Sequence, residues 1–231
     1  MNYSAIDSLQ PTTLQLKKKF YPTDENTECN SFSIDEESVE LMKKKPIFQR
    51  LVSCYDRNAV DGADVSGALI KLGDLLNARS PQVEALRAEN SYIEKKRMED
   101  NLPIFTPCCV LRPDGDCKNY YPIIYTCLID FDILKDDNPN IDFEEFKHEL
   151  TTLQQVAYCG MATNGIDLFC IVPISTPQRY EEHAAALIRQ FKKQGIAIRV
   201  ADGITHTRTI SSDPNGYFNE NAKEFTMLGS F

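Results

Sequence analysis

Two aspartates spaced two residues apart, Asp130 and Asp132, are the residues of this chain best suited to chemistry. They follow an apolar run that begins at Ile123, and this run predicts a buried strand ending at the acids. Because strand side chains alternate between two faces, Asp130 and Asp132 share one face while Phe131 points to the other. Two carboxylates placed in this way can share a divalent cation. The alternative is a strand end in solvent, where aspartate is common.

Composition bounds the kind of protein that carries this acid pair. The 231 residues suffice for one large domain, or for a domain with a helical extension. The formal charge of −9 and the isoelectric point near 4.9 exclude a uniformly basic surface. Contact with nucleic acid must therefore be confined to a local basic groove.

The eight cysteines and the N-terminus indicate a cytoplasmic protein without membrane contact. No pair of cysteines has CxxC spacing, so reduced core thiols are expected. A zinc site made by Cys108, Cys109 and Cys117 is the alternative, although adjacent cysteines suit one tetrahedral ion poorly. The chain shows neither a secretion signal nor an apolar run of ~18 residues.

The first hundred residues predict a polar arm followed by helices. Residues 1–33 are polar and show little periodicity. Apolar residues at helical spacing then form two stripes: Ile47, Leu51 and Tyr55, followed by Val65, Leu69, Leu72 and Leu76. Ser80 and Pro81 predict the start of a third helix that runs toward Asn101. Its basic residues suit a solvated face, or alternatively a phosphate site: Arg87, Lys95, Lys96 and Arg97.

The second half predicts strand, helix, strand, strand, helix and strand between residues 123 and 202. Asp142 caps the first helix, Asn164-Gly165 turns a hairpin, and Thr176-Pro177 begins the second helix. This order indicates an α+β protein with a split βαβ core of the ferredoxin or RNA-recognition-motif type and a helical N-terminal extension. We expect residues 1–101 to form the arm and helical region, and residues 102–231 to form the core.

Charge is divided unevenly over this core. Acids gather after the aspartate pair, whereas basic residues gather on the second helix. Arg189, Lys192 and Lys193 on that helix are therefore the candidates for contact with a nucleic-acid backbone.

Four motifs occur together in one order. They are Leu102-Pro-Ile-Phe-Thr-Pro107, Leu128-Ile-Asp-Phe-Asp132, Ile171-Val-Pro-Ile174, and Asp202 followed by Arg208-Thr-Ile-Ser-Ser-Asp-Pro214-Asn-Gly-Tyr217-Phe-Asn219. Over roughly residues 85 to 225, the chain resembles the N-terminal domain of virulence-associated E-type replication proteins of bacterial mobile elements and phages. That domain is similar to the primase-polymerase branch of the archaeo-eukaryotic primase superfamily.

The resemblance implies a divalent-metal-dependent nucleotidyltransferase that acts on a DNA template. Asp130 and Asp132 match the family's metal-binding pair, and Asp202 matches its later acid. Mg²⁺ or Mn²⁺ would be the cofactor, nucleoside triphosphates the substrates, and a replicative helicase a possible partner. An antiparallel last strand, however, would place Asp202 at the far end of the sheet from Asp130.

One position departs from the family pattern. Phe169 stands where the family has a His or Lys that contacts nucleotide phosphates. Arg208 or His206 would have to replace that phosphate contact, or catalysis has been lost. The alternative function is a non-catalytic module of the same fold that binds DNA or a helicase partner. The chain itself carries no GxxxxGK[ST] phosphate loop.

Overall fold

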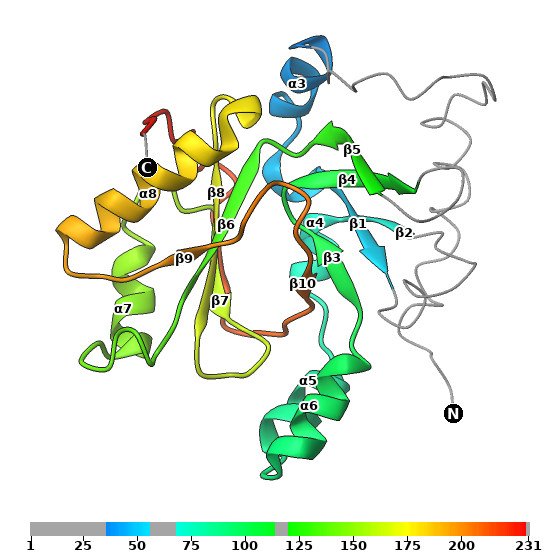
Figure 1. The fold of residues 1–231 in the computed structure, drawn as a ribbon, viewed down its shortest axis with the longest axis vertical. Helices are drawn as coiled ribbons and strands as arrows, with labels where there is room; N and C mark the ends of the chain where they lie inside the picture. Colours follow the sequence, from blue (N-terminus) through cyan, green and yellow to red (C-terminus); the bar gives the residue numbers. More distant parts are fainter. Residues whose placement is uncertain (1–35, 56–67, 114–119, 230–231) are drawn as a thin grey trace.

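The computed structural model describes residues 36–55, 68–113 and 120–229. Within these residues, two antiparallel sheets and a two-stranded ribbon are flanked by helices, so the α+β prediction is confirmed (Figure 1). The expected polar arm, Val65 and Cys117 lie outside the described residues. Within the described part of the chain, no helix combines the length and apolar character needed to cross a bilayer.

The larger sheet carries the acid pair. Its strands are β6 (Leu128–Ile133), β7 (Tyr158–Met161), β8 (Leu168–Pro173), β9 (Arg199–Val200) and β11 (Tyr217–Phe218). Their spatial order is β11-β7-β8-β6-β9, and every neighbouring pair is antiparallel. The connecting helices are α7 (Phe143–Leu150) and α8 (Tyr180–Lys193), the latter preceded by the 3-10 turn η3 (Pro177–Arg179). Both helices cover the sheet face to which Phe131 points (Figure 1).

Local signals begin and end these elements as predicted. The Asp142 side chain accepts hydrogen bonds from the backbone N–H groups of Glu144 and Glu145, which caps α7. Gly165 takes a φ of +71° in the β7–β8 hairpin, and Gly195 takes +79° just after α8. These left-handed conformations are the ones that glycine adopts without steric cost.

The second sheet contradicts part of the helical prediction. Its strands are β1 (Leu51–Tyr55), β2 (Ala68–Lys71), β3 (Ile104–Thr106) and β10 (Arg208–Thr209), in the order β10-β3-β1-β2. The prediction of a helix through Leu51 and Tyr55 is wrong. Val52 and Ser53 are both buried although they lie on opposite faces of β1, so the strand lacks the alternation that would have revealed it. Residues on both sides of the expected boundary after residue 101 share this sheet.

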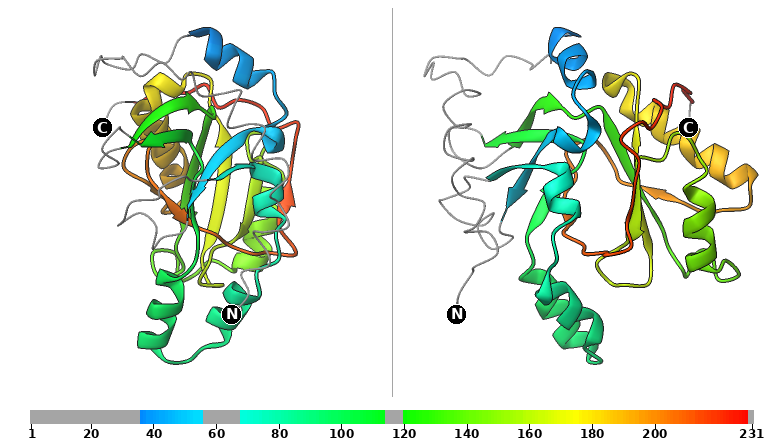
Figure 2. Two further views of the ribbon diagram at one scale, coloured as in Figure 1. Left: turned by 90° about the vertical axis from the view of Figure 1, so that its right-hand side faces the viewer. Right: turned by 180° about the vertical axis from the view of Figure 1, so that it is seen from behind.

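The helices before β3 are short. They are α3 (Glu36–Lys43), the 3-10 turn η1 (Ile47–Gln49), α4 (Leu72–Leu76), α5 (Pro81–Ala88) and α6 (Tyr92–Asp100). Ser80 caps α5 as predicted, but the single helix expected to run to Asn101 is two helices. Ser91 accepts a hydrogen bond from the Glu94 N–H and starts α6, so a second cap divides the helical stretch. The α5–α6 hairpin projects from one end of the molecule (Figures 1 and 2).

The strand expected from residue 123 to residue 132 is also divided. β5 (Tyr120–Tyr125) pairs with β4 (Cys109–Pro113), whereas β6 belongs to the larger sheet. Between β5 and β6, Cys127 takes a φ of +57°, which redirects the chain. The Thr126 hydroxyl donates to the Pro107 carbonyl at 2.7 Å, and this contact holds the junction.

The acid pair faces the interior between the two sheets. Asp130 lies opposite Ile171 and Asp132 lies opposite Phe169 in the antiparallel register, so these four side chains share one face. Ile171 and Phe169 belong to the core that also contains Phe105 of the second sheet. The acids therefore lie beside a packed apolar layer, and not at an open strand end.

Candidate functional site

The site joins two segments that are far apart in the chain. Asp130 and Asp132 come from β6, while His206 and Arg208 come from the loop before β10 and from β10 itself. β10 pairs with β3 and places its arginine against the acids, with Arg208 opposite Phe105 in the register. The structure thus brings together four of the five residues expected at a catalytic or nucleotide site.

Asp130 is fully buried and accepts hydrogen bonds from three side chains. Arg208 Nε donates to Oδ2 at 2.9 Å, and Cys108 Sγ donates to Oδ1 at 3.2 Å. His206 Nε2 lies between the two oxygens, 3.1 Å from Oδ2 and 2.9 Å from Oδ1. Burial alone would raise the pKa of Asp130, but the charges of Arg208 and His206 outweigh it and lower this pKa well below the usual range. Asp130 is therefore an ionised carboxylate held inside the protein.

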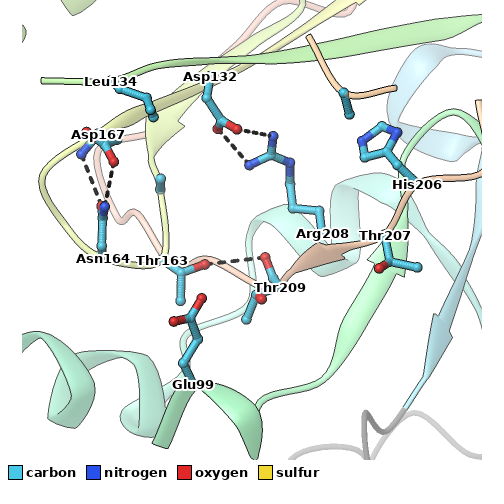
Figure 3. Close-up of a pocket in the computed structure, with 12 residues that line it drawn as sticks. Glu99, Asp132, Leu134, Thr163, Asn164, Asp167, His206, Thr207, Arg208 and Thr209 are labelled. Carbon is cyan, nitrogen blue, oxygen red and sulfur yellow. Dashed lines mark hydrogen bonds and ion pairs between the residues drawn. The ribbon is translucent and has the colours of Figure 1, made fainter. Parts of the chain in front are cut away.

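Asp132 forms a two-pronged ion pair with the same arginine. Arg208 Nη1 and Nη2 donate to the two carboxylate oxygens of Asp132 at 2.8 and 2.9 Å (Figure 3). The guanidinium carbon lies 4.0 Å from the ring centre of Phe169, so the cation also stacks on an aromatic face. Burial would lower the pKa of Arg208, but the two acids raise it overall.

His206 is held at both ring nitrogens. Nδ1 lies 3.1 Å from the Gly203 carbonyl oxygen, and Nε2 faces Asp130. Both partners are acceptors, so the geometry favours an imidazolium that donates from both nitrogens. Burial lowers the pKa of His206, but its hydrogen bond and charge interaction with Asp130 raise the pKa overall.

The side chains of the adjacent residues Cys108 and Cys109 contact different partners. Cys108 donates to Asp130, and burial raises the pKa of this thiol far above its usual value. Cys109 instead places its sulfur 3.2 Å from the carbonyl oxygen of Ile204. The structure therefore does not direct both sulfurs at one ion. None of the six cysteines in the described part of the chain forms a disulfide.

A polar cavity of about 320 Å³ opens beside Asp132 and Arg208 (Figure 3). Glu99, Asp132 and Asp167 contribute carboxylates to its wall, against the cations of Arg208 and His206. Acids thus outnumber bases around the cavity.

Asp202 does not join the pair. β9 ends at Val200, opposite Phe131, and Asp202 is exposed and does not line the cavity. β9 runs antiparallel to β6, with Arg199 opposite Asp132 and Val200 opposite Phe131, so Asp202 does not lie at the far end of the sheet as expected. Its exposed side chain, and not the strand direction, separates it from the cavity.

All four carboxylate oxygens of Asp130 and Asp132 accept hydrogen bonds from protein donors, so Mg²⁺ or Mn²⁺ at the acid pair would have to displace Arg208. A different group could hold a metal ion: ligand atoms of Cys108, Asp130 and His206 all lie within 4.8 Å of one another. Cys108 was not predicted as a partner of Asp130, and nothing in its spacing from the acids indicates the contact.

The predicted basic contacts lie elsewhere. α8 lies on the opposite side of the larger sheet from the acid face, with Lys192 and Lys193 exposed near its C-terminal end (Figure 1). Arg189 is exposed, and its guanidinium lies against Gly229. Arg87 donates to the backbone carbonyls of Ala162, Thr163 and Ser212, so its guanidinium is committed to a structural role.

Comparisons with models of protein families, with curated proteins and with solved structures give no match to this chain.

Proposed function

We propose that this chain is a primase-polymerase-like domain of a mobile-element or phage replication protein, and that it binds DNA or a helicase partner without transferring nucleotides. The order β6-α7-β7-β8-α8-β9 and the spatial order β7-β8-β6-β9 support a split βαβ core of the ferredoxin type. The acid pair on a central strand of that core supports the likeness to the primase-polymerase branch.

The observation that carries the non-catalytic assignment is the three-bond clamp of Arg208 on Asp130 and Asp132. A protein cation takes the place at which the family would hold its metal ions. Removing one partner from such a buried pair leaves an uncompensated charge and costs about 3–5 kcal/mol. The acid pair in this chain therefore acts as an anchor between β6 and β10.

Phe169 supports the same assignment. It lies on the acid face, but it is fully buried and lies under Arg208, where a phosphate donor would be required for catalysis. A phenyl ring offers no hydrogen-bond donor to a phosphate.

DNA contact is assigned to the C-terminal end of α8, where Lys192 and Lys193 are exposed. Binding of single-stranded DNA should weaken with salt, with a slope of about −0.7 per neutralised phosphate. Lys192→Glu with Lys193→Glu should reduce the affinity and the slope. Lys95→Glu with Lys96→Glu on α6 makes the same change of charge on another helix and should have little effect.

A primer-extension assay tests the proposal directly. The full chain is incubated with Mg²⁺ or Mn²⁺, primed and unprimed DNA, and nucleoside triphosphates. No extension is expected from the wild type. Extension that disappears in Asp132→Asn would contradict the proposal.

Such a result would establish the second candidate, a metal-dependent primase or polymerase. One observation favours this candidate: the Asp132 side chain is 29% exposed and lines the cavity, so a ligand in the cavity can reach its carboxylate. Catalysis would then require the Arg208 side chain to move away from Asp130 and Asp132, so the active state would lack these three hydrogen bonds.

A further inference from the structure

Three side chains from separate segments converge beneath the cavity. Cys108 lies between β3 and β4, Asp130 lies on β6, and His206 precedes β10. We propose that Cys108, Asp130 and His206 form a zinc site, which shares only Asp130 with the magnesium or manganese site expected at Asp130, Asp132 and Asp202. This inference does not depend on the proposed function.

The distances between the ligand atoms suit one ion. The Cys108 Sγ and His206 Nε2 atoms lie 3.2 and 2.9 Å from Asp130 Oδ1. Zinc bonds of ~2.0–2.3 Å in a tetrahedron separate neighbouring ligand atoms by roughly 3.3–3.7 Å. Outward shifts of a few tenths of an ångström bring these two distances to the zinc values, and the third pair, Cys108 Sγ and His206 Nε2, lies within 4.8 Å.

The surrounding groups orient the ligands as outer partners of a metal site do. His206 directs Nδ1 to the Gly203 carbonyl oxygen at 3.1 Å, which leaves Nε2 for the ion. Arg208 holds the second oxygen of Asp130 at 2.9 Å, which fixes the plane of the carboxylate. Both kinds of support are common around zinc ligands.

Two ligands of the cluster can balance the charge of the ion. Binding of Zn²⁺ would release the Cys108 S–H proton to solvent, and the resulting thiolate with the Asp130 carboxylate would neutralise the two positive charges. Asp132 remains as the partner of Arg208.

The donor set selects the metal. A thiolate and an imidazole suit zinc, whereas Mg²⁺ and Mn²⁺ prefer oxygen ligands. His206 also lines the cavity, so an ion can approach its Nε2 from that side while Cys108 and Asp130 remain buried. A water molecule would complete the four ligands.

Cobalt titration of the reduced, metal-free full chain tests the proposal, because Co²⁺ bound by a thiolate gives a near-ultraviolet charge-transfer band. The wild type should bind one equivalent, and zinc should displace it. Cys108→Ser keeps the size and the hydrogen-bond donor but removes the thiolate. It should weaken binding by about 100-fold or more, because even changes at outer partners cost about 10–100-fold. Cys109→Ser is the matched control and should bind as the wild type does.

Two outcomes would overturn the zinc site. One is a wild type that gives no thiolate band at one equivalent of cobalt. The other is a band that persists in both Cys108→Ser and His206→Gln, since the ion would then lie elsewhere. Melting curves of the metal-free Cys108→Ser and His206→Gln proteins show whether each variant folds. If only one of them folds, the cobalt titration of that variant decides whether the zinc site exists. The extension assay reports independently on the proposed function.

Discussion

At the scale of single residues, Arg208 neutralises both acids of β6. Arg208→Gln should lower the free energy of unfolding by about 3–5 kcal/mol, because it removes the arginine that neutralises the buried Asp130 and the half-buried Asp132. Arg179→Gln removes a comparable arginine from an exposed ion pair with Glu182 and should cost no more than about 1 kcal/mol. Urea unfolding of both variants measures the difference. Equal effects would show that the clamp adds nothing beyond a surface pair.

A second buried ion pair predicts a dependence on pH. Asp213 bonds Lys147 and the backbone N–H groups of Met161 and Asn215. Burial raises the pKa of Asp213, but the bonds to Lys147 and to the backbone lower it overall. A lowered folded-state pKa gives stability that is present above the unfolded pKa, near 3.9, and is lost as the pH falls through the folded value.

Asp213→Asn should therefore be less stable than the wild type at pH 7, and the gap should shrink as the pH is lowered below about 4. Melting curves of both proteins between neutral and acid pH test this. A gap that stays constant with pH would show that Asp213 does not stabilise the fold through its charge.

At the scale of elements, the β7–β8 hairpin depends on Gly165. An alanine here would keep the positive φ that L residues disfavour. Its Cβ would also lie 2.8 Å from Cδ of Arg87, whose guanidinium donates to three backbone carbonyls. Gly165→Ala should cost more than the roughly 1–2 kcal/mol of a left-handed alanine. Gly195→Ala shares the positive φ but has open space around its Cβ, so it isolates the backbone cost. Thermal unfolding that ranks the two variants equally would refute the steric contribution of Arg87.

The elements that could be predicted from the sequence carry their signals within a few residues. Asp142 caps α7, Asn164 and Gly165 turn the hairpin, and Pro177 precedes α8. β1 could not be predicted because both of its faces are buried. The break at Cys127 depends on contacts far along the chain, including Arg50, which donates to the Thr126 carbonyl at 2.7 Å.

The site was predictable only in part for the same reason. Asp130 and Asp132 could be placed on one strand face from their spacing. Their ion pairs could not, because they depend on the pairing of β10 with β3, which lie about a hundred residues apart in the chain. Asp202 matched a family motif, yet its side chain is exposed to solvent and does not line the cavity beside the acids.

At the scale of the whole molecule, stability should be distributed unevenly. α6 contains no buried residue and lies in the projecting α5–α6 hairpin, whereas β6 and β8 lie at the centre of the larger sheet. Amide hydrogen exchange should therefore be fastest in α6 and slowest in β6 and β8 among the described elements. Protection of α6 equal to that of β6 would contradict this and would indicate that the hairpin is covered in solution.

The backbone and the side chain of Arg208 interact with different sheets of the molecule. The backbone of Arg208 is paired with β3 in the smaller sheet, while its guanidinium grips β6 in the larger one. Arg208 thus joins the two sheets at the edge of the core that they share. A cation or proton that draws the carboxylates away from Arg208 would remove this connection, so a local change of charge would weaken the contact between the sheets.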